Sequence, residues 1–123
     1  MKLETFEDME VWQDARALVK SIYGVTSVSA FARDYALRDQ LRRASISIMS
    51  NIAEGFDRAS NKDFMRFLSI SKASASEVRS QLYIALDLNY LDEQAFEELK
   101  TRAISISRQL SAFMKYLKQS EVY

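Results

Sequence analysis

The stretch LRDQLRRASISIMSNIAEG, residues 37–55, repeats apolar side chains every three or four positions and contains no proline. This spacing is typical of an α-helix, which advances about 100° per residue. Gly55 is predicted to end this helix in the left-handed conformation, with a positive φ. We therefore predict a helix that begins between residues 32 and 34 and ends at Gly55. Its apolar face consists of Leu37, Leu41, Ala44, Ile48 and Ile52.

The same spacing predicts three further helices, one before this stretch and two after it. The first begins near Thr5, because Thr5 and Asp8 fit a capping box, and its pattern fails at Gly24. The segment VTSVSAF that follows is predicted to be a connection. Serine and aspartate are favoured helix caps, and they predict the remaining helices at 61–89 after Ser60 and at 93–119 after Asp92.

Four helices with short joints predict an all-α fold, an antiparallel up-down-up-down four-helix bundle. No segment alternates apolar and polar residues for long enough to predict a strand. The whole chain, residues 1–123, is expected to form one domain. The two middle helices are expected to be the longest.

The composition argues against catalysis. The 123 residues include no cysteine and no histidine, and only two glycines. Disulfides, thiolate ligands and histidine bases are therefore excluded, and a di-iron site of the Glu-x-x-His type is excluded with them. Two glycines leave no room for a glycine-rich phosphate loop. We expect no enzyme activity, no catalytic residues, no metal, no cofactor and no small-molecule substrate.

The net charge limits the possible partners of the protein, and the N-terminal sequence limits its possible location in the cell. Seventeen basic residues balance seventeen acidic ones, so no overall field attracts nucleic acid or membranes. The N-terminal residues MKLETFEDMEVW are acidic where a signal peptide would be apolar. We expect a cytoplasmic protein that does not enter the membrane.

Two of the predicted helices are apolar on more than one side. A helix inside a monomeric bundle needs one apolar stripe, and a second stripe needs a second cover. Self-association into a ring-like homo-oligomer is the favoured interpretation; the alternative is that the helix over residues 37–55 lies centrally and loops cover its extra side. The candidate interface residues are Ile46, Met49, Ala53, Ile70, Ala73 and Ile84.

Polar residues run between the two apolar sides of this helix. Arg43, Asn51 and Glu54 lie along this line, and Glu77 and Gln81 are expected opposite them. Two interpretations are open: a half-buried network that fixes the register of the bundle, or a cleft that binds a ligand. The network is favoured, provided that its members are nearly all paired. Asn51 and Glu54 are then expected to bind backbone or arginine partners.

Basic residues concentrate in the middle third of the chain. Seven of them stand against five acidic residues between positions 33 and 66, an excess of 7 − 5 = +2. Asp34 and Arg38, and likewise Asp39 and Arg43, have the spacing of neutralising pairs on a helix. The surface is therefore either an ordinary salt-bridged one or, when repeated around a ring, a phosphate-binding one. The candidate nucleic-acid contacts are Arg38, Arg42, Arg58, Lys62 and Arg66.

Three segments together resemble the four-helix bundle family of the 23S ribosomal RNA intervening-sequence proteins. They are FEDMEVWQDARALVKSIY, LRDQLRRASISIMSNIAEGFDRAS and FMRFLSISKASASEVRSQLYIALDLNYL, between Phe6 and Leu91, and the last predicted helix matches only in character. The most specific matches are Gln40, Arg42, Arg43, Ala44, Ser47, Ile48, Asn51, Ile52, Ala53, Glu54 and Gly55. The others are Trp12, Gln13, Ala15, Phe64, Phe67, Leu68, Glu77, Gln81, Leu82, Ala85 and Tyr90.

A few residues depart from the family pattern. Met49 stands where proline is frequent, and Asp57 and Asn89 stand where glycine is frequent. Asparagine adopts the left-handed conformation more readily than most residues. Arg79 replaces a common acidic residue, so the family's charge pattern on that face is in doubt here.

The resemblance implies an up-down-up-down bundle that assembles as a homopentamer and has no catalytic activity. More distantly, the family is similar to pentameric accessory proteins of diversity-generating retroelements, which bind nucleic acid and a reverse transcriptase. Two functions follow as expectations: a nucleic-acid-associated accessory module that binds RNA or DNA, or a protein-binding scaffold. The two differ in whether the candidate arginines face solvent together or are tied to Asp34, Asp39 and Asp63.

Overall fold

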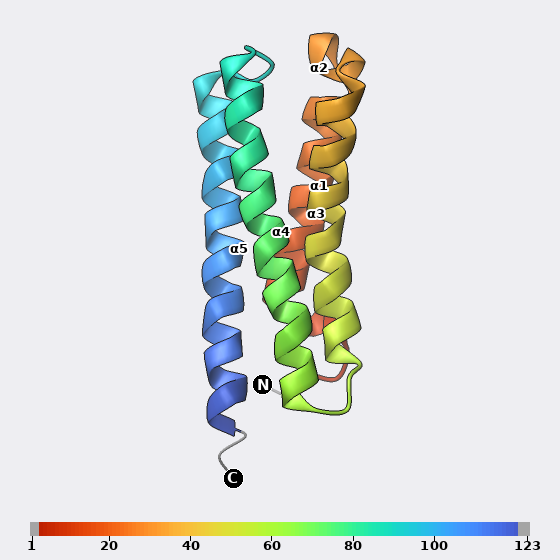
Figure 1. The fold of residues 1–123 in the computed structure, drawn as a ribbon, viewed down its shortest axis with the longest axis vertical. Coiled ribbons are helices and arrows are strands. Elements are labelled where there is room, and N and C mark those ends of the chain that lie inside the picture. The colour runs from red at the N-terminus through yellow and green to blue at the C-terminus, as the bar shows by residue number, and fades with distance from the viewer. Residues whose placement is uncertain (1–2, 121–123) are drawn as a thin grey trace.

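The computed structural model describes residues 3–120, which form four long helices running alongside one another (Figure 1). Successive long helices point in opposite directions, so the fold is all-α and antiparallel as predicted. No strand occurs within the described residues, and none of their helices is long and apolar enough to cross a membrane. The elements are η1 (Phe6–Asp8), α1 (Glu10–Thr26), α2 (Ser29–Arg33), α3 (Tyr35–Phe56), α4 (Asn61–Asp87) and α5 (Glu93–Ser120).

Each long helix packs against two others. Helix α3 lies against α4, α4 lies against α5, and α1 contacts both α3 and α5. The apolar face predicted from residues 37–55 points into the resulting core, where Leu41, Ile48 and Ile52 are fully buried. Burial of such side chains is the main stabilising contribution of the fold, about 25 cal/mol per Å² of apolar surface removed from water. Other fully buried core residues are Leu18, Ile22, Leu68, Val78, Leu82, Ile106 and Leu110.

The predicted helix caps at Ser60 and Asp92 are confirmed. The Ser60 hydroxyl accepts a hydrogen bond from the Asp63 amide at 3.1 Å, and the Asp92 carboxylate accepts one from the Ala95 amide at 2.8 Å. Each bond satisfies an amide that has no partner inside the helix. A third cap was not predicted: the Asp34 carboxylate accepts from the Leu37 amide at 3.1 Å and separates α2 from α3.

The first helix differs from its prediction at both ends. The Asp8 carboxylate accepts hydrogen bonds from the amides of Glu4 and Thr5, both at 3.1 Å, but this cap holds the short 3₁₀-helix η1, and α1 begins only at Glu10. Helix α1 then continues through Gly24 to Thr26. Part of the expected connection is helical as well, because α2 forms within it. The longest helices are α4 and α5, with 27 and 28 residues, rather than the two middle ones.

The predicted role of Gly55 is wrong. No glycine among the described residues has a positive φ, and α3 continues past Gly55 to Phe56. Glycine is required here for space: a Cβ atom at this position would lie 2.8 Å from Cβ of Phe67 and 2.9 Å from Cδ1 of Phe64. The left-handed residues are Ser29, with φ 56°, and Asn89, with φ 61°. The family departure at Asn89 is therefore one that its backbone tolerates.

Candidate functional site

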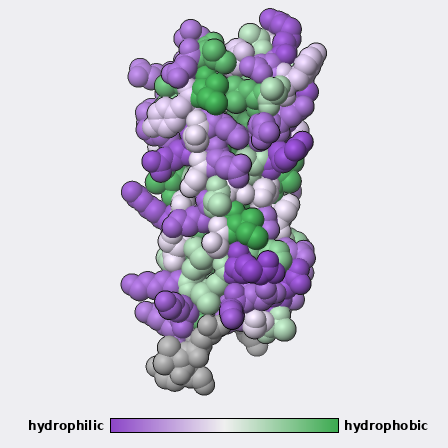
Figure 2. All heavy atoms as spheres, in the orientation of Figure 1, coloured by the Kyte–Doolittle hydropathy of each residue, from purple (hydrophilic) through white to green (hydrophobic). Residues whose placement is uncertain are grey.

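Exposed apolar side chains form two stripes, one on α3 and one on α4. Among them, Ile46, Ile70 and Ile84 are 38%, 39% and 47% exposed, whereas isoleucines of the core are fully buried. Figure 2 shows hydrophobic side chains gathered over the upper end of α4 and again near the middle of this face. The α3 stripe is the name used below for Ile46, Met49 and Ala53. The α4 stripe is the name for Ile70, Ala73 and Ile84.

The two stripes differ in how much of their apolar surface is exposed to solvent. Met49 and Ala53 are half-buried and pack against the core, so that Ile46 is the most exposed member of the α3 stripe. All three residues of the α4 stripe are exposed. The structure therefore exposes four of the six predicted interface candidates, one on α3 and three on α4, and leaves Met49 and Ala53 half-buried.

A narrow polar seam joins α3 to α4. The Ser71 hydroxyl donates to the Ile48 carbonyl at 2.8 Å, and the hydroxyls of Ser74 and Ser47 are 2.8 Å apart. Asn51 donates to the Ser47 carbonyl at 2.9 Å and to its hydroxyl at 3.0 Å. Such bonds between small side chains fix the register of one helix against the other. Ser71 and Ser74 lie in the stretch SISKASAS, residues 69–76, whose small side chains predict a tight contact with a neighbouring helix, and the structure places both at such a contact.

The polar network predicted on α3 and α4 is only partly formed. Asn51 and Glu54 have the expected partners, since Glu54 pairs with Arg58 at 2.6 Å. The buried Oε1 atom of Gln81 has no hydrogen-bond partner in the described part of the chain. Arg43 and Glu77 are both exposed, and neither forms a hydrogen bond or an ion pair within residues 3–120. Asn51 and Glu54 are therefore paired locally, within α3 and with the joint that follows it, but no bond between the predicted members links α3 to α4 among the described residues.

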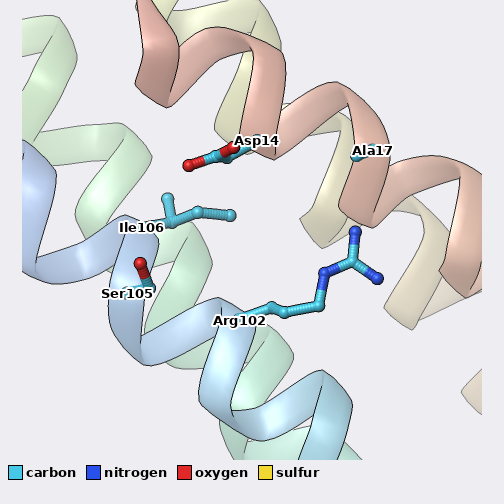
Figure 3. Close-up of a pocket in the computed structure, with 5 residues that line it drawn as sticks. All are labelled: Asp14, Ala17, Arg102, Ser105 and Ile106. Carbon is cyan, nitrogen blue, oxygen red and sulfur yellow. The ribbon is translucent and has the colours of Figure 1, made fainter.

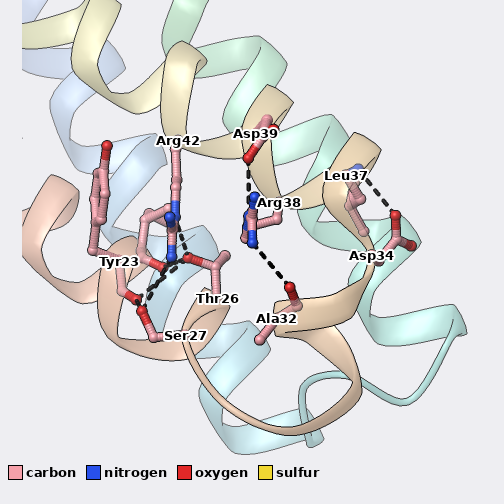
Figure 4. Close-up of polar contacts among 10 residues, drawn as sticks. Tyr23, Thr26, Ser27, Ala32, Asp34, Leu37, Arg38, Asp39 and Arg42 are labelled. Atoms are coloured by element: carbon pink, nitrogen blue, oxygen red, sulfur yellow. Dashed lines mark hydrogen bonds and ion pairs between the residues drawn. The ribbon is translucent and has the colours of Figure 1, made fainter.

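Arg42 closes the C-terminal end of α1 (Figure 4). Its Nε donates to the Thr26 hydroxyl at 2.8 Å, and its Nη2 donates to the Ser27 hydroxyl at 3.1 Å. The Thr26 hydroxyl in turn donates to the Ile22 carbonyl at 2.7 Å, and the guanidinium lies 4.4 Å from the centre of the Tyr23 ring. Carbonyls in the last turn of a helix lack intrahelical partners. Arg42 is thus a structural clamp between α3 and α1, a role that the sequence did not indicate.

Arg38 is engaged in a similar way, but not with its predicted partner. Its Nε donates to Asp39 at 2.9 Å and its Nη1 donates to the Ala32 carbonyl at 3.0 Å (Figure 4). Asp34 instead accepts from the Tyr90 hydroxyl at 2.9 Å, and this hydrogen bond raises the pKa of the Tyr90 phenol. The expected pairs of Asp34 with Arg38 and of Asp39 with Arg43 are therefore both wrong.

The remaining basic candidates lie at the other end of α3, around the joint with α4. Arg66 pairs with Asp63 at 3.0 Å, and Arg58 lies 3.7 Å from the same carboxylate. Both guanidiniums also contact the Phe67 ring, whose centre lies 4.6 Å from that of Arg58 and 4.5 Å from that of Arg66. Lys62 is exposed and has no ion pair among the described residues.

The candidate nucleic-acid contacts therefore do not form one patch. About 20 Å of helix separates the set at Arg42 from the set at Arg58. At the α3–α4 joint three basic residues face three acidic ones, Glu54, Asp57 and Asp63, so the local net charge is 3 − 3 = 0. The whole excess lies at the opposite end, where Arg33, Arg38, Arg42 and Arg43 outnumber Asp34 and Asp39 by 4 − 2 = +2.

A cavity of about 180 Å³ lies between α1 and α5 (Figure 3). Its charged lining residues, Asp14 and Arg102, each have a partner on the facing helix: Gln109 donates to Asp14 at 2.9 Å, and Arg102 donates to Ser21 at 2.7 Å. Ala17, Ser105 and Ile106 complete the lining (Figure 3). These pairs tie α5 to α1. Within residues 3–120, no three acidic side chains converge as a metal site would require.

These features define a class of protein: an antiparallel helical bundle with a polar seam between α3 and α4 and exposed apolar side chains on both helices. The sequence profile of the 23S rRNA-intervening sequence proteins matches residues 7–112, and the chain belongs to this family. The match extends into α5, beyond the segments that carried the resemblance in the sequence alone.

A solved structure with the same fold supports the architecture. It is the crystal structure of a protein of unknown function from the S23 ribosomal protein family of Bacteroides thetaiotaomicron. The TM-score is 0.79 at 21% sequence identity, and the alignment covers 85% of this chain and 98% of that one. At this identity the likeness concerns the fold alone. No curated protein gives a significant match to the chain.

Proposed function

We propose that this chain is a non-enzymatic, self-assembling helical module that acts as a scaffold. The observation that carries the proposal is the presence of exposed isoleucines on two separate helix faces, although the bundle already has a complete core. Isoleucine is among the residues most often found buried, so three that are 38% or more exposed on neighbouring helices favour a cover supplied by another molecule.

The placement of the two stripes supports a closed assembly. The stripes lie on different helices and are separated by the polar seam. A contact in which the α3 stripe meets the α4 stripe only once per interface is head-to-tail, and such contacts close into rings when the rotation permits. We propose that the α3 stripe of one copy covers the α4 stripe of the next. The family resemblance favours a homopentamer.

Sedimentation velocity of the full chain at micromolar concentration tests this proposal directly. Wild-type protein is expected to sediment as an oligomer, and Ile84→Ser and Ile46→Ser are each expected to weaken association about tenfold or more, since each removes apolar area from the contact. Tyr116→Ser is the matched control, because Tyr116 is 62% exposed on α5, away from both stripes. A wild-type chain that stays monomeric under these conditions would overturn the proposal.

Nucleic-acid binding is the second candidate function. The observation in its favour is that Lys62 is unpaired in the described structure and that the Arg66 side chain is 60% exposed beside it, so a ring would repeat this pair on every subunit. Against it, acidic residues cancel the charge at this joint, and Arg42 is occupied as a clamp. The scaffold is therefore the better supported function.

A fluorescence-anisotropy titration with mixed-sequence RNA and DNA at two salt concentrations tests the second candidate. Phosphate-dominated binding should weaken as salt rises. Lys62→Gln combined with Arg66→Gln should weaken it without changing assembly. Arg42→Gln is unsuitable, because it would also release the end of α1. Absence of binding at low salt would leave the scaffold function alone.

A further inference from the structure

We infer that Arg43 of one copy pairs with Glu77 of the next, and that this pair selects the head-to-tail contact. This inference rests on the proposed function, because it names the charged residues that would specify the same contact. It starts from a contrast within α3. The helix contains five charged residues, and four of them, Arg38, Asp39, Arg42 and Glu54, have a partner within the described chain.

Arg43 is the remaining charged residue of α3, and it lies next to the α3 stripe. It precedes Ile46 by three residues, which places the two side chains on neighbouring turns of one face. Both side chains also line one shallow depression, together with Tyr23 of α1 and with Asp39 and Arg42 of α3, which are bonded to Arg38 and to the end of α1. A molecule that covered Ile46 would therefore also cover, or lie beside, a guanidinium that has no ion-pair partner within residues 3–120.

Glu77 has the matching position on α4. It follows Ile70 by seven residues and precedes Ile84 by seven, so the three side chains lie along one line of the helix surface. Its carboxylate is thus placed inside the α4 stripe and has no partner among the described residues. Burial of an unpaired carboxylate in an apolar contact is unfavourable, so the covering surface must supply a cation.

The signs of the two charges determine which contact is favoured. A two-fold contact centred on the α4 stripe brings Glu77 against Glu77, and a two-fold contact between two α3 stripes buries two Arg43 side chains in one interface without an acidic partner. Like charges at an interface are repulsive, whereas contact of an α3 stripe with an α4 stripe brings opposite charges together. The occupant of each stripe is therefore the other stripe of a second copy of this chain.

The competing arrangement is an ion pair within a single chain. Ser47 and Ser74 meet across the seam, Arg43 lies four residues before Ser47, and Glu77 lies three residues after Ser74. In antiparallel helices these offsets place Arg43 and Glu77 at similar heights on either side of the seam. They form no ion pair with each other in this structure, but a change of rotamer would bring them closer. The experiment must therefore separate pairing between chains from pairing within one.

Charge reversal in the full chain distinguishes an ion pair between two chains from an ion pair within one chain. Arg43→Glu and Glu77→Arg should each weaken assembly about tenfold or more in sedimentation velocity, because each places like charges at the contact. The double variant should regain most of the wild-type association. Mixing the two single variants, one of them carrying an affinity tag, should allow the tagged variant to capture the other, because every contact between unlike variants brings opposite charges together. In a five-membered ring four of the five contacts can be of this kind. Arg79→Glu is the control, an exposed charge on α4 outside the stripe.

Each outcome decides between the possibilities. Single variants that assemble like the wild type overturn the inference and leave the scaffold function intact. A double variant that assembles while the mixture does not shows a pair within one chain, which also overturns the inference. A wild-type chain that is monomeric overturns the proposed function itself and the inference with it. Circular dichroism of every variant checks that the fold is retained.

Discussion

The contact between α3 and α4 and the contact between α1 and α5 are built from different kinds of residue. Across the first, small side chains meet: hydroxyls of Ser47 and Ser74 are 2.8 Å apart, and Gly55 leaves room for Phe67. Across the second, long side chains reach over a gap: Arg102 donates to Ser21 at 2.7 Å, beside a cavity of about 180 Å³.

The difference shows where the bundle tolerates change. A close contact between small residues has no spare volume, so added atoms must displace a helix. A contact held by long polar side chains at the edge of a cavity has spare volume, and its hydrogen bonds are partly exposed. Substitutions that enlarge a residue should therefore have opposite consequences on the two sides of the molecule.

The largest expected effect comes from enlarging one serine on each side. Ser74→Leu should destabilise the fold by about 2–3 kcal/mol, because Ser74 is buried in the seam and leucine overpacks it. Ser105→Leu should change stability by no more than about 0.5 kcal/mol, because Ser105 is exposed at the edge of the cavity. Urea unfolding followed by circular dichroism measures both. Equal losses would show that the α1–α5 contact is as tightly packed as the other.

The two glycines should respond in opposite directions to the same substitution. Gly55→Ala should cost about 1–2 kcal/mol, because the added Cβ would lie 2.8 Å from Cβ of Phe67, an atom fixed to the α4 backbone. Gly24→Ala should stabilise the protein by about 0.5–1 kcal/mol, because nothing lies within 4 Å of an added Cβ and alanine favours a helix. Thermal unfolding of the two variants beside the wild type is the measurement. A stabilised Gly55→Ala variant would refute the close approach of the helices.

Loss of a single hydrogen bond should have a smaller effect on stability, and the effect should again differ between the α3–α4 contact and the α1–α5 contact. Ser71→Ala removes the buried bond to the Ile48 carbonyl and should cost about 1 kcal/mol. Arg102→Ala removes a half-exposed bond to Ser21 and should cost about 0.5 kcal/mol or less. The urea concentrations at the midpoint of unfolding give the two losses of stability, provided that the m-value is the same in both variants and the wild type. The comparison fails if Arg102→Ala is the more damaging change.

Helical spacing was sufficient to predict most of the fold. Apolar periodicity located the four long helices, and Ser60 and Asp92 capped two of them as expected. The end of α1 differs from its prediction, because the apolar pattern fails at Gly24 while the helix continues through it; an exposed glycine within a helix costs only about 1 kcal/mol. At Gly55 the sequence indicated that glycine was needed, but the reason lay in Phe64 and Phe67, which come from another helix.

The candidate site was harder to predict, because pairing depends on distances between helices. Spacing along one helix predicted that Asp34 would pair with Arg38, but Asp34 binds Tyr90 instead, 56 positions away. Arg42 lies in a basic cluster of the sequence and binds the end of α1 in the structure. The exposed isoleucines were placed correctly, since a second apolar side of a helix is a property of that helix alone.

The smallest expected effect concerns pH, at the upper end of the α3–α4 pair. Tyr90, which follows α4, donates a hydrogen bond to the Asp34 carboxylate, which precedes α3, and this bond raises the pKa of the phenol above its ordinary value of 10.0. The folded protein therefore holds this proton more tightly than the unfolded chain. Its stabilising contribution is complete below the ordinary pKa and is lost as the pH rises through the raised one.

Tyr90→Phe removes the hydroxyl and with it this dependence on pH. Near neutral pH the variant should be slightly less stable than the wild type, because the bond to Asp34 is gone. Above about pH 10 the difference should shrink, because the wild type then loses the same bond when Tyr90 ionises. Urea unfolding of both proteins from neutral to strongly alkaline pH tests this, and other ionising groups cancel in the comparison. A difference in stability that stays constant across that range would mean that the Tyr90 phenol does not donate a hydrogen bond to Asp34 in solution.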